Sequence, residues 1–121
     1  MTTDPQMISF SPAIAHIQDL PRGDSAQFNI TLEYEDGTPY DLTGYDVNMH
    51  LRRADDSLVL SLGIGDGITV NDNVISVSLA SADTEPLDQN YTYHYDVEIS
   101  LGGTVRTVSW GTLKTLKQFT Y

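Results

Sequence analysis

YTYHYDVEISL, residues 91–101, carries the longest strict alternation of apolar and polar side chains in this sequence. Successive side chains of a β-strand point to opposite faces, so one face of this segment takes the apolar residues and the other takes the polar ones. The apolar face holds Tyr91, Tyr93, Tyr95, Val97, Ile99 and Leu101. The stretch therefore predicts a strand with one buried face.

The same two-residue period recurs on both sides of this strand. Further strands are expected at 26–34, 45–53, 58–62 and 105–110, with two more inside 68–80. No segment shows apolar residues at i, i+3, i+4 and i+7 for long enough to predict a helix of ordinary length. The pattern is typical of an all-β protein.

Turn residues separate the expected strands. Gly102 and Gly103 close the hairpin that follows the long alternating strand, since glycine accepts the positive φ that hairpin turns need. Segment 81–87 predicts a single helical turn, with Ser81 as its N-cap and a proline at its end. Gly111 lies where the apolar phase of the last strand changes, which indicates a β-bulge.

The spacing of these elements predicts the fold. Roughly seven to eight strands at intervals of about 8–12 residues favour a single immunoglobulin-like β-sandwich of antiparallel strands. A chain of 121 residues holds one such domain. We divide it into an extended N-terminal arm, residues 1–18, and a β-sandwich domain, residues 19–121, because the arm contains two prolines and no clear alternation. The arm is apolar enough that we expect it to lie on this domain or on a neighbour.

Composition excludes several classes of partner. Six Lys and Arg against 17 Asp and Glu give a formal charge of −11, so we expect no nucleic acid partner, since phosphate backbones bind clustered basic side chains. No stretch approaches the roughly 20 apolar residues of a membrane span, so we expect no membrane partner. The absence of cysteine leaves no disulfide framework and is compatible with a reducing cytoplasm.

The sequence gives little indication of catalysis. His16, His50 and His94 are the candidate general bases near neutral pH, and none lies beside a recognisable nucleophile motif. Glycine-rich phosphate loops followed by a helical pattern are also absent. We therefore expect no enzyme, no catalytic residue, no cofactor-binding residue and no cofactor.

Two groups of residues contain side chains that could bind a metal ion. His94, Asp96 and Glu98 share the outward face of one strand, but a straight strand spreads them about 6.6–7 Å apart, whereas a metal needs several ligands that converge at about 2.0–2.6 Å. Asp66 and Asp72 lie among glycine and asparagine residues, but without the spacing of an EF-hand loop. The simpler interpretation is a solvated strand face and two turns, so we expect no metal-binding residue.

The order of the pieces resembles a known family. Residues 22–62 combine a Gly-Asp turn, an alternating strand, the run D-G-T-P-Y-D-L-T-G, a strand that ends in basic residues and an Asp-rich turn. Further on, SLASADTEPLDQNYTYHYDVEISLGGTVRTVSWGTLKTL adds a short loop helix, an aromatic strand that ends in D-V-E, a glycine hairpin and V-R-T before a glycine. Over about residues 20–116 the chain resembles the small immunoglobulin-like modules of tailed-phage virions, and is similar to the N-terminal domain of the baseplate upper protein family. Members of that family often carry long further domains, so the resemblance does not by itself single out the baseplate as this chain's position in the virion.

The resemblance implies a non-enzymatic structural component of a bacteriophage virion: a head decoration, neck, tail or baseplate, or fibre-base protein. Such a protein docks against other virion proteins and forms a homo-oligomer in the particle, after assembly in the cytoplasm of the host bacterium. We expect the terminal segments 1–18 and 118–121 to dock. The protein-interaction residues are expected to be Ile8, Phe10, Ile14, Phe119 and Tyr121.

The alternative is a carbohydrate-binding module that attaches the particle to a host surface. Its sugar-stacking platform would use the tyrosine row Tyr91, Tyr93 and Tyr95 together with Tyr45 and Trp110. The row lies on the apolar face of its strand, and this position favours a place in the core.

Overall fold

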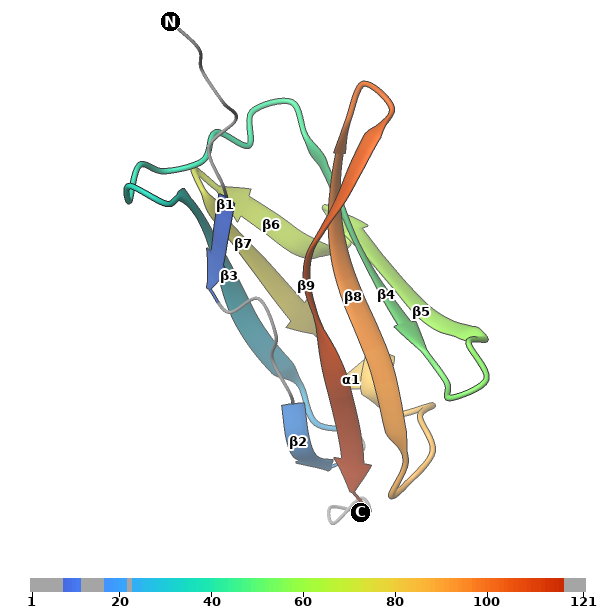
Figure 1. Cartoon of the computed structure of the whole chain (residues 1–121). Coiled ribbons are helices and arrows are strands. Elements are labelled where there is room, and N and C mark those ends of the chain that lie inside the picture. The colour runs from blue at the N-terminus through green and yellow to red at the C-terminus, as the bar shows by residue number, and fades with distance from the viewer. Residues whose placement is uncertain (1–7, 12–16, 22, 117–121) are drawn as a thin grey trace, which may run out of the picture.

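The computed structural model describes residues 8–11, 17–21 and 23–116, with side chains described for Leu20 and for 23–116. The elements are β1 (Ile8–Ser11), β2 (Ile17–Pro21), β3 (Ala26–Tyr34), β4 (Asp46–Arg52), β5 (Leu58–Ile64), β6 (Gly67–Asn71), β7 (Val74–Leu79), α1 (Ser81–Thr84), β8 (Thr92–Leu101) and β9 (Thr104–Leu116). The strands join in the order β1-β3-β7-β6-β5-β4-β8-β9-β2 (Figure 1). The chain is all-β, as predicted.

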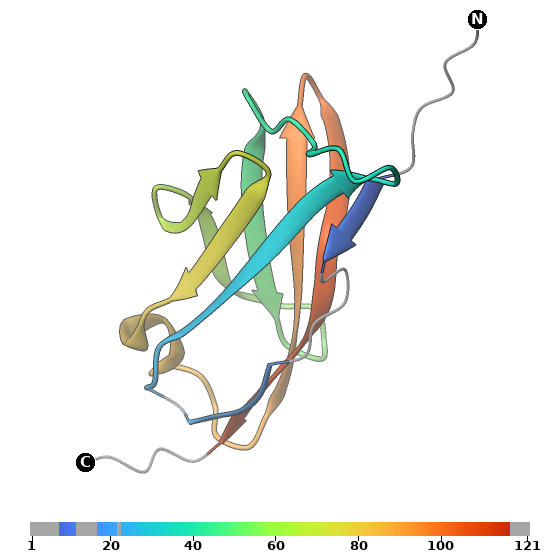
Figure 2. The same ribbon diagram turned by 90° about the vertical axis from the view of Figure 1, so that its left-hand side faces the viewer.

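This continuous sheet folds over on itself into an immunoglobulin-like sandwich. One layer holds β1, β3, β7 and β6, and the other holds β5, β4, β8, β9 and β2, as the turned view in Figure 2 shows. The layers are joined where β5 and β6 pair at Gly63 and Gly67. Gly67 has a φ of +91°, and a Cβ added there would lie 2.9 Å from Leu62 Cδ2. Only glycine fits this corner.

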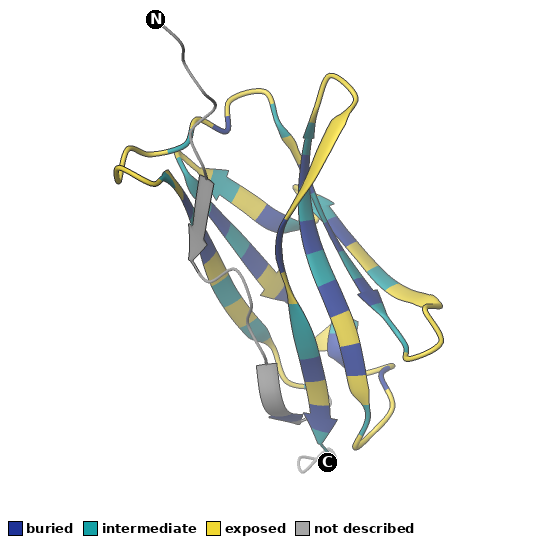
Figure 3. Cartoon of the chain, in the orientation of Figure 1, coloured by how far each residue is buried: buried dark blue, intermediate teal, exposed yellow. Residues whose placement is uncertain are grey.

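The core lies between the layers, and the predicted alternation fills it. Along β8 the buried residues alternate with exposed or intermediate ones as bands in Figure 3, although Leu101, at the hairpin end, is exposed. The core residues are Leu20, Ile30, Leu32, Leu42, Val47, Met49, Leu51, Leu62, Ile68, Ile75, Val77, Leu79, Leu87, Tyr93, Tyr95, Val97, Ile99, Val108 and Leu113. Burial of so many apolar side chains is the main force that holds the two layers together.

The segment predicted as an N-terminal arm, residues 1–18, contains β1 and the first two residues of β2, and these two strands are the outermost strands of the sheet. β1 pairs antiparallel with β3, where Ile8 lies opposite Tyr34, and β2 pairs parallel with β9, where Ile17 lies opposite Leu113. The predicted seven to eight antiparallel strands therefore become nine in the described part of the chain, with two parallel pairs, β2–β9 and β5–β6. Short edge strands held by backbone hydrogen bonds need no apolar alternation, so the pattern did not reveal them.

The β-bulge of the last strand lies earlier than predicted. The register between β8 and β9 slips between Val97 and Glu98, which makes Val108 the extra residue of β9. Val108 and Ser109 are consequently both buried. Gly111 keeps regular pairing with β8, so the prediction of a bulge there was wrong. The bulge at Val108, and not Gly111, changes which set of alternate residues of β9 points into the core.

The predicted helical turn is present as α1, but its cap differs. Ala80 is the N-cap residue, and its N–H donates to the Asp83 carboxylate at 2.9 Å, so Ser81 is already the first helical residue. Thr84 is buried, and its hydroxyl donates to the Asp24 carbonyl at 2.7 Å. This bond attaches the helix to the loop before β3. Within the described residues, no helix is long and apolar enough to cross a membrane.

Candidate functional site

The outward face of β4 and β8 gathers three potential metal ligands. His50 on β4 lies directly opposite Asp96 on β8, and Glu98 follows two residues later on the same face. One ligand atom from each of the three side chains lies within 4.8 Å of the other two. We call these three residues the His50 cluster. It comes from two neighbouring strands that hydrogen bond to each other, so the sheet itself fixes the spacing.

The His50 cluster is half-buried and its charges are not balanced. The side chains of His50 and Asp96 are 23% and 39% exposed, and Nδ1 of the first lies 3.7 Å from Oδ1 of the second. Asp96 Oδ1 itself is closed off from solvent and has no hydrogen-bond partner within the described part of the chain. Among the described lysines and arginines, none forms an ion pair with Asp96 or Glu98. A buried acceptor without a partner is unusual in folded proteins and costs stability.

The sequence pattern had placed a different histidine beside these carboxylates. His94 does lie on the same strand, but it is exposed and lies opposite Arg52 of β4. The neighbouring strand supplies the converging histidine, His50. A signal was present in the sequence, since the alternation within 45–53 already directed His50 outward, but the register between the two strands was not known.

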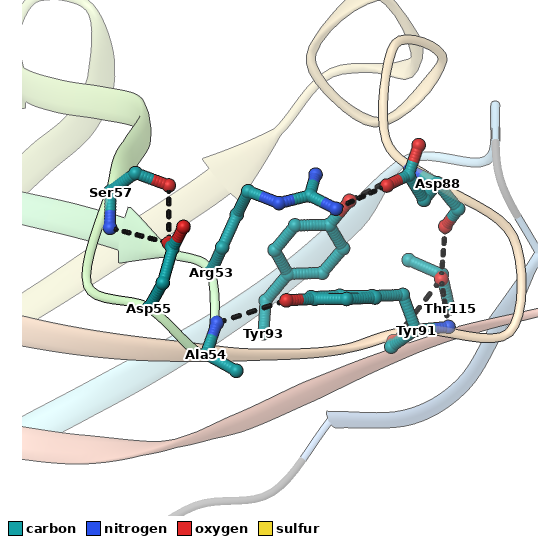
Figure 4. Close-up of polar contacts among 8 residues, drawn as sticks. All are labelled: Arg53, Ala54, Asp55, Ser57, Asp88, Tyr91, Tyr93 and Thr115. Atoms are coloured by element: carbon teal, nitrogen blue, oxygen red, sulfur yellow. Dashed lines mark hydrogen bonds and ion pairs between the residues drawn. The ribbon is translucent and has the colours of Figure 1, made fainter.

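A second polar cluster lies just beyond the C-terminal end of β4 (Figure 4). The Arg53 guanidinium donates to the Asp88 carboxylate at 2.5 Å and lies over the Tyr91 ring, 4.5 Å from the ring centroid. This hydrogen bond raises the pKa of Arg53 above its ordinary value. The backbone N–H of Asp88 donates to the Tyr93 hydroxyl at 2.7 Å. The buried Thr115 hydroxyl donates to the Asp88 carbonyl and accepts the Tyr91 N–H.

These five residues, Arg53, Asp88, Tyr91, Tyr93 and Thr115, form what we call the Arg53 cluster. It connects the turn after β4, the loop before β8 and the end of β9. Its positive group lies beside its negative group, and its buried hydroxyls have partners. Such an arrangement holds the turn after β4, the loop before β8 and the end of β9 together at this end of the sandwich.

An aromatic hollow lies at the other end of the sandwich. The Tyr34 and Tyr40 ring centroids are 5.3 Å apart, and those of Tyr40 and Tyr45 are 5.8 Å apart. The hydroxyls of Tyr40 and Tyr45 share a hydrogen bond of 2.7 Å. Burial and the Tyr45 hydroxyl raise the pKa of Tyr40 to about 12. Tyr40, Tyr45 and Arg106 line a hollow of about 280 Å³. The hollow offers aromatic faces and one cation to a small polar ligand.

Large apolar side chains are exposed at two rims and on one face of the domain. Leu58 and Val59 are exposed at the start of β5, and Leu101 and Val105 are exposed at the tip of the β8–β9 hairpin. Trp110, 45% exposed, lies opposite Asp96 on the outward face. Exposed apolar groups that gather in this way are typical of contact surfaces.

The predicted interaction residues fall largely outside this description. Ile8 and Phe10 belong to β1, and their side chains are not among those described. Ile14, Phe119 and Tyr121 lie outside the described residues.

The tyrosine row divides between the core and the surface. Tyr93 and Tyr95 are buried in the core, as their position on the apolar face of the strand favoured, and Tyr91 is half-buried beneath Arg53. The row therefore offers no continuous platform for a sugar.

The comparisons with known proteins give a distant structural likeness. No protein-family model and no curated protein matches the sequence. Among solved structures, the chain is similar to the ASH / PapD-like domain of human CEP192 (PapD-like domain 7), with a TM-score of 0.43 and 12% sequence identity. The match covers 98% of this chain and 92% of that one. So distant a likeness carries no argument about function.

Proposed function

We propose that this protein is a non-enzymatic structural component of a tailed-phage virion that acts by docking against other virion proteins and against copies of itself. The ordered succession of turns and strands over about residues 20–116 supports the proposal through its resemblance to virion modules. The protein takes its place as a head decoration, neck, tail or baseplate, or fibre-base component, and is assembled in the cytoplasm of the host bacterium.

The observation that carries the proposal is the exposed apolar surface at the two rims. Val105 at the hairpin tip is 58% exposed and Leu58 at the start of β5 is 50% exposed, although the chain as a whole carries a formal charge of −11. Acidic copies repel each other in solution, so assembly needs fitted contacts that overcome the repulsion. Apolar rims on a stiff acidic body provide such contacts.

The terminal segment offers a second means of docking. β1 and β2 are the outermost strands of the sheet, and an edge strand leaves backbone donors and acceptors that can pair with a strand of a neighbour. Ile8, Phe10 and Ile14 of the arm, with Phe119 and Tyr121 at the other terminus, remain the proposed contact residues.

An incorporation assay tests the proposal. The assay follows the chain in a lysate that produces the parent particle. A variant that lacks residues 1–14 loses β1 and keeps β2, so its sandwich should still fold. We expect this variant to be absent from purified particles. Leu101→Ser with Val105→Ser reduces incorporation through the hairpin rim, whereas Thr69→Ser, an exposed position on β6, does not. The proposal fails if the deletion and the hairpin variant enter particles as the unaltered chain does, or if the chain is absent from the particle altogether.

A second candidate function is carbohydrate binding, and the aromatic hollow favours it. Tyr40 and Tyr45 place two tilted rings beside Arg106, the combination of aromatic face and polar group that sugars bind. Binding on a glycan array that Tyr40→Ala abolishes would support this function. No array signal, together with co-purification with a capsid or tail protein, would leave the docking function in place.

A further inference from the structure

We propose that the His50 cluster binds one divalent transition-metal ion of the Zn²⁺ class. The proposal rests on the juxtaposition of an imidazole and two carboxylates across two paired strands, with ligand atoms within 4.8 Å of one another. It is independent of the docking function, since a virion component and a sugar-binding module could each carry such an ion.

The spacing is close to what a metal requires. Ligands at about 2.0–2.2 Å from a tetrahedral Zn²⁺ lie about 3.4 Å from one another. His50 Nδ1 and Asp96 Oδ1 are already 3.7 Å apart, and a Glu98 carboxylate oxygen lies within 4.8 Å of a ligand atom of each. The backbone needs no movement, because seven consecutive residue pairs hold β4 and β8 in register. The site is therefore preorganised by the centre of a sheet.

The electrostatics also favour a cation. Asp96 and Glu98 place two carboxylates side by side, and Asp96 Oδ1 is shut off from water without a hydrogen bond. Arg52, the nearest arginine along β4, donates instead to the Asp56 carbonyl at 3.1 Å. A 3.7 Å separation between His50 and Asp96 is too long for a hydrogen bond. A bound ion would give Asp96 Oδ1 the partner that the protein does not supply.

The donor set selects the class of metal. Ca²⁺ and Mg²⁺ prefer sites made of oxygen ligands, whereas an imidazole nitrogen with two carboxylate oxygens suits Zn²⁺ and its first-row neighbours. Three protein ligands leave one tetrahedral position for water. Trp110 lies opposite Asp96, so its indole is placed to report on occupancy through fluorescence.

Isothermal titration of the full-length chain with ZnCl₂ tests the proposal, with the tag removed and EDTA dialysed away beforehand. We expect one Zn²⁺ per chain, and an affinity at least tenfold lower in His50→Asn, Asp96→Asn and Glu98→Gln. The matched control is His94→Asn, which removes a histidine from the same outward face two residue pairs away and should change the affinity less than twofold. His16→Asn controls for binding by the terminal segment.

A second measurement needs no substitution. Imidazole nitrogen NMR of the unaltered chain should show the His50 signals moving on addition of Zn²⁺ while those of His94 stay in place. The proposal is overturned by the absence of one-to-one Zn²⁺ binding, by tighter binding of Ca²⁺ than of Zn²⁺, or by a loss in His94→Asn as large as that in His50→Asn.

Discussion

The His50 cluster lies on β4 and β8, and the Arg53 cluster lies where the chain leaves β4, enters β8 and reaches the end of β9. The two clusters use similar chemistry in opposite ways. In the Arg53 cluster a carboxylate, a guanidinium and three hydroxyl-bearing side chains pair with one another or with nearby backbone groups (Figure 4). In the His50 cluster two carboxylates and an imidazole converge, and none of the described residues gives Asp96 Oδ1 a hydrogen bond.

The difference indicates what each cluster is for. A network whose groups are satisfied holds elements in one arrangement and adds stability. A half-buried group of like charges adds little or none, so the fold gains nothing from keeping it unless something else binds there. Stability and ligand binding can therefore be separated by substitution.

The largest expected effect is in the Arg53 cluster. Tyr93→Ala should lower the free energy of unfolding by about 3–5 kcal/mol, because it empties a fully buried aromatic site beneath Arg53. Tyr93→Phe keeps the ring and loses only the acceptor for the Asp88 N–H, so its cost should be about 1 kcal/mol. Urea denaturation measures both. Equal costs would mean that the ring contributes nothing beyond its hydroxyl.

Thr115→Val should come next, with a loss of about 1–3 kcal/mol. The substitution keeps the shape of a fully buried side chain but removes the hydroxyl that bonds to the Asp88 carbonyl and the Tyr91 N–H. Thr69→Val on β6 is the control, since Thr69 is exposed. If Thr115→Val and Thr69→Val unfold at the same urea concentration, the buried Thr115 hydroxyl does not contribute to the stability of the Arg53 cluster.

The same substitution in both clusters sharpens the comparison further. In metal-free buffer at pH 7.5, Asp88→Asn should lower the free energy of unfolding by about 0.2–1 kcal/mol, the range of an exposed ion pair. Asp96→Asn should leave it unchanged or raise it by up to about 0.5 kcal/mol, because a like charge beside Glu98 is removed. Thermal melts of the two variants give the sign. A larger loss in Asp96→Asn would reverse the assignment of the clusters.

The smallest effect concerns acid stability at the turn that follows Arg53. Hydrogen bonds from the Ser57 hydroxyl and backbone N–H lower the pKa of Asp55. A carboxyl whose pKa is lower in the folded state stabilises the protein above its unfolded pKa, and this contribution is lost as the pH falls through the folded value. Ser57→Ala should move the Asp55 pKa, followed by carboxyl-carbon NMR, back toward the ordinary value. An unchanged titration would show that Ser57 is not the cause.

The sequence predicted the parts of the fold that depend on side-chain burial. β3 matches the expected 26–34, and the inward residues of β8 fill the core, because in both strands the two-residue period follows directly from which face is buried. The arm strands and the bulge at Val108 escaped prediction. Both depend on backbone pairing with a partner strand, which leaves little trace in the order of apolar and polar residues.

For the candidate site too, the sequence predicted which face of its strand each residue occupies, but it did not predict how the two strands pair. Asp96 and Glu98 were correctly placed on an outward face, and so was His50 on its own strand. What brings them together is the register of β4 against β8, which pairs His50 with Asp96 and places His94 two pairs away, opposite Arg52. Thr115 also gave no signal, because a buried threonine near the end of a strand looks like any β-branched residue until its partners are known.

A cryo-electron microscopy map of the parent particle tests the proposed docking function most directly. If the protein docks as proposed, the map should show density for this sandwich at defined positions. The sandwich should contact neighbouring proteins through the exposed rims at Leu58 and Val105 or through the N-terminal arm that contains β1. A particle whose map has no place for the chain, while the purified protein stays monomeric and binds sugars at Tyr40, would contradict it.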